Sequence, residues 1–156
     1  MARVKPRESN LQRLHRALVV ALGQEPVARF MAPGVEVVSA PNLPAASWGS
    51  RMATRERVKK QRQAGFFVGR ALLRGASELE PGVPWGVGPW VVLFVRVAPK
   101  RLDDDNLAGA FKAIRDGVAD AFGYNDGSEG ISWLYDQARP GADRQPGIEV
   151  TLWRAP

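Results

Sequence analysis

The feature that most constrains the fold is an apolar run, Trp90–Ala98, that leads within a few residues into three consecutive aspartates, Asp103–Asp105. The run is rich in β-branched and aromatic residues and is typical of a buried strand. After the aspartates, apolar residues recur at helical spacing and form one face: Leu107, Ala110, Phe111, Ile114, Val118, Ala121 and Phe122. The sequence therefore predicts a buried strand, then a helix packed on the core, with the aspartates at the junction.

The aspartates have two interpretations. If the chain is extended here, Asp103 and Asp105 point to the same side, and their charges favour a bound cation such as Mg²⁺. The alternative is helix capping, because aspartate accepts hydrogen bonds at a helix start and suits the helix dipole. Three acids exceed what a cap needs, which favours the first interpretation. On the polar face of the helix, Lys112 and Asp116 indicate either functional groups or an exposed ion pair.

These residues resemble the RusA-type Holliday-junction resolvases. That family carries Arg–Asp–x–Asp–Asn–Leu at a strand-to-helix junction, then a lysine and an aspartate on the helix, and aspartates in the next turn. The matching residues are Arg101, Asp103, Asp105, Asn106, Leu107, Lys112, Asp116, Asp126 and Ile131. The resemblance covers Pro89–Trp153, and more loosely the segment from Val35. Two positions depart from the family pattern: Gly109 stands where the family has its lysine, and Asn125 replaces one aspartate of the turn.

The resemblance implies an endonuclease that depends on Mg²⁺, or on Mn²⁺ in its place, and cuts branched DNA such as Holliday junctions in recombination and repair. It also implies a homodimer in the cytoplasm of a bacterium, encoded by the host, a prophage or a phage. The expected metal ligands are Asp103, Asp105 and Asp126, with Asp116 next and Asp104 in reserve. Lys112 would stabilise charge on the phosphate.

Composition is consistent with that chemistry. The 156 residues carry 22 Lys and Arg against 16 Asp and Glu, a net charge of +6. A basic background attracts polyanions, whereas an acidic cluster repels them unless a metal neutralises it. The alternative is a basic protein with an acidic loop. The chain has no cysteine, and its one histidine, His15, is expected to be half-buried. The absence of cysteine fits a reducing compartment, and we expect neither a secretory signal nor a membrane span.

The remaining segments predict an α+β fold, a small mixed sheet packed with helices plus an added N-terminal helix. That helix is expected over Glu8–Gly23, with Ser9 and Gln12 at capping-box spacing. The other expected elements are a linker over Gln24–Gly34, a strand over Val35–Ala40, a loop over Pro41–Arg51, a helix over Met52–Ala76, and strands over Ile131–Gln137 and Ile148–Trp153. This divides the chain into an extension, residues 1–34, and a nuclease domain, residues 35–156.

Basic residues cluster in the first half of the helix over Met52–Ala76 and before the aspartates. They are either a solvated surface or DNA-phosphate contacts, and the expected contacts are Arg55, Lys59, Lys60, Arg62, Lys100 and Arg101. Gly65 and Gly69 allow close packing of that helix, and Trp48 is either a base-stacking or a core residue. Two rivals stay open: a non-catalytic nucleic-acid-binding protein, and a metal-dependent nuclease for flaps or RNA.

Overall fold

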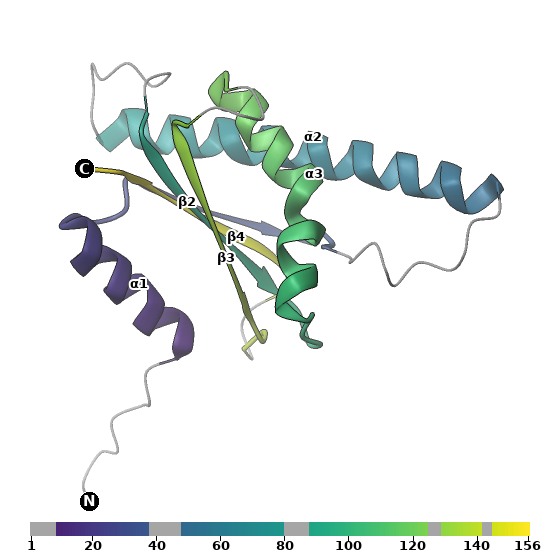
Figure 1. The fold of residues 1–156 in the computed structure, drawn as a ribbon, viewed down its shortest axis with the longest axis horizontal. Helices are drawn as coiled ribbons and strands as arrows, with labels where there is room; N and C mark the ends of the chain where they lie inside the picture. The colour runs from purple at the N-terminus through teal and green to yellow at the C-terminus, as the bar shows by residue number, and fades with distance from the viewer. Residues whose placement is uncertain (1–8, 38–47, 80–87, 125–128, 142–144) are drawn as a thin grey trace, which may run out of the picture.

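The apolar run forms an inner strand of a four-stranded sheet. The computed structural model describes residues 9–37, 48–79, 88–124, 129–141 and 145–156 (Figure 1). Their elements, in chain order, are α1 (Asn10–Leu22), β1 (Ala28–Pro33), α2 (Trp48–Leu79), β2 (Trp90–Val97), α3 (Asp104–Phe122), β3 (Ile131–Ala138) and β4 (Gly147–Arg154). The expected α+β class is confirmed.

The sheet is mixed, with strand order β1-β4-β2-β3. β2 and β3 are parallel, and α3 is the crossover helix between them. β4 is antiparallel to both β1 and β2. Because parallel strands end at the same edge of a sheet, the segments that follow β2 and β3 lie close together. This edge is where the three aspartates begin.

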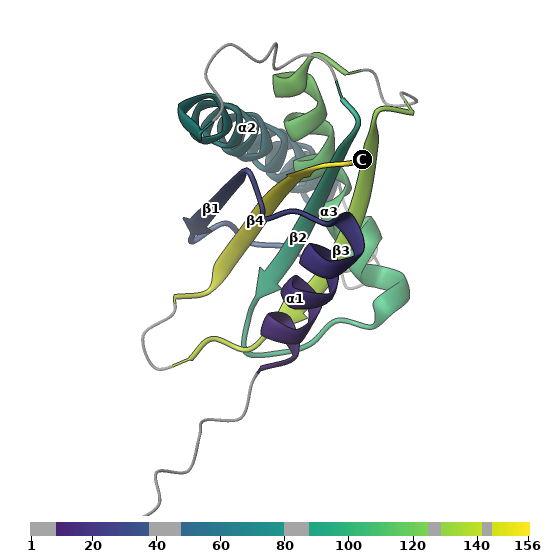
Figure 2. The same cartoon turned by 90° about the vertical axis from the view of Figure 1, so that its left-hand side faces the viewer.

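Helices cover both faces of the sheet (Figure 2). Trp90, Val92 and Phe94 of β2 pack in the core beneath α2 and α3. Val91 and Leu93, which alternate with them, pack on the opposite face with Leu11 of α1. Since both faces of β2 are buried, its sequence is almost continuously apolar instead of alternating. Among the described residues, no helix combines the length and apolar character needed to cross a bilayer.

α1 begins with the expected capping box. Ser9 N–H donates to Gln12 Oε1 at 2.8 Å, and Gln12 N–H donates to Ser9 Oγ at 3.2 Å. His15 is half-buried, as expected, with its ring 5.4 Å from that of Trp153. Its Nε2 lies 3.8 Å from Oε1 of Glu149, a fully buried carboxylate that Arg29 Nη2 approaches to 2.5 Å. The arginine offsets the cost of burying that charge, and α1 thereby covers a polar centre in the sheet.

α2 and α3 cross at glycines, which brings their backbones into close contact. A Cβ added to Gly65 would lie 2.1 Å from the backbone oxygen of Ile114, and one added to Gly117 would lie 2.0 Å from that of Arg62. Only glycine fits at such distances. The expectation that Gly65 and Gly69 allow close packing is confirmed, since a Cβ on Gly69 would also meet Ala121 at 2.6 Å. Gly117 was not foreseen.

Three expectations about the first half of the chain are wrong. The segment predicted to be a linker contains β1, which pairs with β4 from Ala28↔Leu152 to Pro33↔Gly147. The strand predicted for Val35–Ala40 is absent over residues 35–37, and residues 38–40 lie outside the described part. β1 therefore belongs to the sheet, although it was assigned to the N-terminal extension. α2 also begins earlier than predicted, at Trp48, inside the expected loop.

Candidate metal and nucleic-acid site

The three aspartates lie at the junction between the β2–α3 loop and the start of α3, and all three are exposed. Asp103 is the N-cap residue with an extended backbone (φ −66°, ψ 147°), whereas Asp104 and Asp105 lie in the first helical turn. The expectation that Asp103 and Asp105 share one side of an extended segment is therefore wrong, because Asp105 is already helical. The capping alternative is confirmed in part: Asp103 occupies the N-cap position, but its side chain makes no capping hydrogen bond. The carboxylates do meet the positive end of the helix dipole.

Gln137 holds the segment directly before the aspartates. Its side chain is 7% exposed and lies near the end of β3, opposite Arg96 of β2. Gln137 Oε1 accepts from Leu102 N–H at 2.9 Å, and Gln137 Nε2 donates to the Leu102 carbonyl at 2.7 Å. One side chain thus satisfies both backbone groups of the residue before Asp103, and so orients the start of α3.

Arg96 makes a second connection to the same loop. Its Nη1 donates to the Lys100 carbonyl at 2.5 Å, and its Nε donates to the Val37 carbonyl at 3.1 Å. Burial lowers the pKa of the Arg96 guanidinium. Arg96 also lines an open hollow of about 550 Å³ at this edge of the sheet, together with Gly34–Val37, Val97–Pro99 and Gln145–Gly147. Pro99, which lines the hollow, lies four residues before Asp103 in the chain.

The polar face of α3 carries ion pairs. Lys112 Nζ lies 3.2 Å from Asp116 Oδ2, with the two side chains 60% and 19% exposed. Arg115 Nη2 lies 3.5 Å from the other oxygen of Asp116. The ion-pair interpretation of Lys112 and Asp116 is thus realised in this structure. Gly109, one turn before Lys112, has open space where a Cβ would be.

Arg62 of α2 binds Asp120 of α3 with two bonds. Its Nε and Nη2 lie 2.7 Å and 3.0 Å from the two carboxylate oxygens. The hydrogen bond from Arg62 lowers the pKa of the Asp120 carboxyl. A guanidinium already bound to a carboxylate has less charge to offer a phosphate. Arg62 is therefore a weaker candidate for DNA contact than its sequence position indicated.

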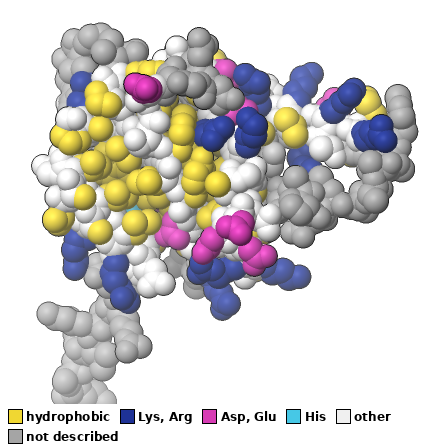
Figure 3. Space-filling model, in the orientation of Figure 1, with side chains coloured by type: hydrophobic (Ala, Val, Ile, Leu, Met, Phe, Trp, Pro, Cys, Tyr) yellow, Lys and Arg dark blue, Asp and Glu magenta, His cyan; other side chains and the backbone are white. Residues whose placement is uncertain are grey.

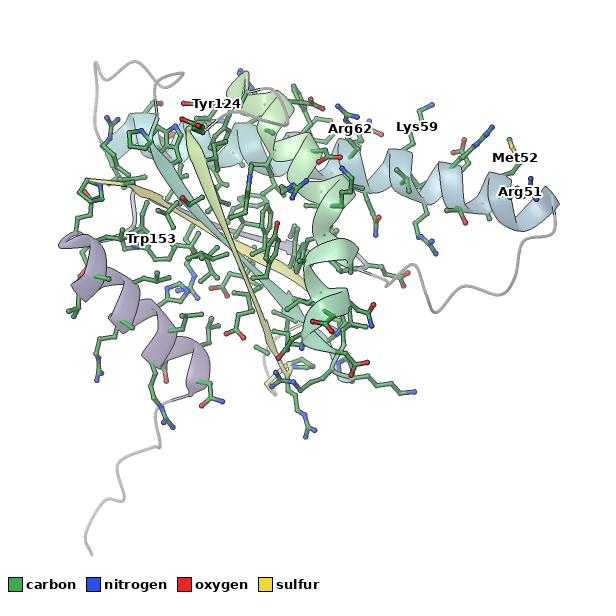
Figure 4. All side chains as sticks on the ribbon, in the orientation of Figure 1. Arg51, Met52, Lys59, Arg62, Tyr124 and Trp153 are labelled. Carbon is green, nitrogen blue, oxygen red and sulfur yellow. The ribbon has the colours of Figure 1, made fainter. Side chains whose placement is uncertain are left out.

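The other expected DNA contacts are exposed, and they fall in two places: Lys100 and Arg101 beside the aspartates, and Arg55, Lys59 and Lys60 on α2. The start of α2 projects past α3 (Figure 1). Figure 3 shows acidic side chains gathered where α3 begins, with basic side chains beside them and more along the projecting end of α2. In Figure 4, Met52 and Lys59 lie along that end, and Arg62 lies where α2 passes α3.

The donor chemistry of the aspartates suits a hard cation, since Mg²⁺ takes carboxylate oxygens. Within the described ranges, however, no three acidic or histidine side chains come close enough together to hold a metal ion. Asp126, the third expected ligand, and Asn125 beside it lie outside the described residues. The residues at the start of α3 therefore fit part of a metal site.

Sequence reasoning missed Gln137, Arg96 and the Arg62–Asp120 pair. Gln137 and Arg96 come together because β2 and β3 are parallel and in register, a relation that no local pattern reveals. In comparisons with known proteins, the chain matches no protein-family model, and neither a curated protein nor a solved structure matches it significantly. The resemblance to the RusA-type resolvases thus depends on the residues alone.

Proposed function

We propose that this protein is a metal-dependent endonuclease that cuts branched DNA, of the kind the RusA-type resemblance implies. One observation carries the proposal: three consecutive exposed carboxylates lie at the exit of an inner strand, on a protein of net charge +6. Exposed like charges repel one another, and here they stand beside the exposed cations Lys100 and Arg101. A divalent cation and a phosphodiester together would satisfy both sets of charges.

In this proposal Asp103 and Asp105 would hold Mg²⁺ or Mn²⁺, with Asp126 as a further ligand and Asp104 in reserve. The bound ion would supply an activated water and offset charge on the phosphate. The Gln137 bonds to Leu102 would keep the first carboxylate in place. Asp116 is 19% exposed and bound to Lys112, so its part would be to position that lysine.

Lys112 would approach the scissile phosphate from α3. It lies seven residues after Asp105, about 10 Å along the helix axis, and its side chain leans back toward the helix start. Gly109 leaves that path open. The ion pair with Asp116 would have to exchange for a contact with phosphate. The Lys112 side chain is 60% exposed, so its ammonium can make that exchange through solvent, and Asp116 would keep Arg115 Nη2 at 3.5 Å.

A second candidate is a nucleic-acid-binding protein without catalysis. The projecting end of α2 favours it, because its exposed cations, Arg55, Lys59 and Lys60, can contact phosphates without any metal. In that case the aspartates would serve only to start α3 in a favourable dipole environment. The two candidates differ in their requirement for a divalent ion.

The deciding experiment incubates the purified protein with labelled four-way junction, flap, duplex and single-stranded DNA, in Mg²⁺ and in EDTA. The nuclease proposal expects that the protein cleaves the junction in Mg²⁺ and that EDTA abolishes this cleavage. The Asp105→Asn variant should lose the activity. The control variant Asp120→Asn, in the Arg62 ion pair, should retain it. Binding without cleavage in any divalent ion would favour the second candidate. If flaps, or an RNA counterpart, are cleaved in preference to junctions, the proposed substrate is replaced by that nucleic acid. Light scattering of the same sample tests the expected homodimer.

A further inference from the structure

Two neighbouring phenylalanines on α2 are exposed to solvent. Phe66 is 41% exposed and Phe67 is 62% exposed. Their ring centroids lie 6.3 Å apart in an edge-to-face arrangement. Large aromatic side chains usually bury 150–250 Å² each, so this pair leaves much of its apolar surface in water. Exposed apolar surface of this kind marks an interaction site when its surroundings favour a particular partner.

The surroundings of the pair are cationic. Lys59 and Lys60 lie seven residues before Phe66 and Phe67, which is nearly two turns and about 10 Å along the same side of the helix. Arg70 and Arg74 follow the pair on that side at helical spacing, and all four cations are exposed. Two acids share this stretch: Glu56 lies one turn before Lys60, and Glu78 forms an exposed ion pair of 3.3 Å with Arg74.

A surface hollow begins one turn past Phe67. It measures about 580 Å³, and the described residues that line it are Arg70, Ala71, Leu73, Arg74 and Ser77. The Arg70 guanidinium and the Nη groups of Arg74 are hydrogen-bond donors suited to phosphate oxygens, and the described lining contains no acid. Arg74 Nε is already bonded to Glu78, and the Ser77 hydroxyl donates to the Arg74 carbonyl, so Arg70 is the stronger phosphate contact of the two arginines. The aromatic pair thus has a place for phosphate on one side and two lysines on the other.

We propose that Phe66 and Phe67 form a stacking site for unpaired bases of a nucleic-acid strand whose phosphates contact Lys59, Lys60, Arg70 and Arg74. This rests on the proposed function, and it specifies the substrate as branched DNA that carries an unpaired or splayed segment. Every base has a π-face that can stack on an aromatic ring, so such a site tolerates any sequence. In a duplex those faces are covered by neighbouring bases, and the phenyl rings gain nothing from it.

The test measures binding in EDTA, so that cleavage plays no part. Labelled oligothymidine and a duplex of equal length are titrated with the wild type, with the Phe66→Ala/Phe67→Ala variant and with the matching double tyrosine variant. Val58→Ala is the matched control, because Val58 is also an exposed apolar residue of α2, 45% exposed. Around the helix it lies about 180° from Phe67 and about 80° from Phe66. Thermal unfolding and light scattering accompany each variant.

The expected result is that the double alanine variant binds oligothymidine roughly tenfold or more weakly than the wild type, with duplex binding within twofold. The tyrosine variant and Val58→Ala should bind both like the wild type. Unchanged oligothymidine binding by the alanine variant would overturn the proposal, as would an equal loss for duplex. A change in oligomeric state would identify the pair as a protein interface instead. Mg²⁺-dependent junction cleavage by the wild type is measured separately. If the protein cleaves junctions but the stacking proposal is refuted, the proposed nuclease function is retained.

Discussion

Replacing Gln137 by methionine is expected to loosen the start of α3. Methionine has a similar volume to glutamine and three rotatable bonds, so it can fill the same space without hydrogen bonds. The change removes the 2.9 Å bond from Leu102 N–H and the 2.7 Å bond to the Leu102 carbonyl. Since Gln137 is only 7% exposed, water has little access to replace both bonds.

The magnitude follows from those two bonds. A buried polar group that loses its partner costs about 1–3 kcal/mol, and Leu102 is half-buried, so water recovers part of that cost. We expect a loss of about 2–3 kcal/mol in the free energy of unfolding. For a domain of this size that lowers Tm by roughly 4–12 °C. The loss should be concentrated near the aspartates, because Gln137 contacts the backbone there.

The chain offers a matched control in Gln61 of α2. Gln61 is 8% exposed, and its Nε2 donates to the Glu36 carbonyl at 2.8 Å. Gln61→Met therefore removes one bond of the same type, to the Glu36 carbonyl, and leaves both Leu102 bonds in place. Urea unfolding gives the two free energies, and amide hydrogen exchange over residues 102–107 reports the order of the loop. Only Gln137→Met should speed that exchange and raise the Mg²⁺ concentration needed for half-maximal cleavage.

Equal exchange over residues 102–107 in Gln137→Met and the wild type would refute the positioning role of Gln137. If hydrogen exchange is faster but the Mg²⁺ dependence of cleavage is unchanged, Gln137 orders the loop but does not affect the proposed metal site. These outcomes separate the structural argument from the functional one, because hydrogen exchange needs no activity.

Four further predictions follow from the structure. Asp105→Asn should abolish cleavage and leave DNA binding intact or tighter, as electrophoretic mobility shift measures. Lys112→Ala should lower the single-turnover cleavage rate about a hundredfold with unchanged Tm. A near-normal rate would mean that Lys112 only pairs with Asp116 and takes no part in cleavage. Lys59→Ser should reduce the slope of log affinity against log salt by about 0.9 for duplex DNA, and an unchanged slope would move the binding surface elsewhere. Gly117→Ala should cost about 1–3 kcal/mol or more, because its Cβ would meet a backbone oxygen of α2 at 2.0 Å, whereas Gly109→Ala, in open space, should stabilise the helix by up to about 1 kcal/mol. Urea unfolding of the two glycine variants decides this, and equal effects would contradict it.

Local patterns were enough to predict several elements. Ser9 and Gln12 predicted the start of α1, because a capping box requires only residues three apart. The apolar run predicted β2, and the helical spacing after Leu107 predicted the buried face of α3. β1 was missed because its sequence, ARFMAP, shows no clear alternation and ends in a proline. It is a strand because β4 offers it a partner.

The sequence by itself determined the composition of the aspartate segment and its place between a strand and a helix. The tertiary structure decided which groups act on that segment. Gln137 reaches Leu102 across 35 residues, and Arg62 reaches Asp120 across 58. The two helix glycines illustrate the same division. Gly109 and Gly117 look alike in the sequence, yet one faces open space and the other lies against α2. A local pattern reports what a residue can do with its near neighbours in the chain, whereas long-range contacts depend on strand order and helix crossing, which exist only in the folded chain.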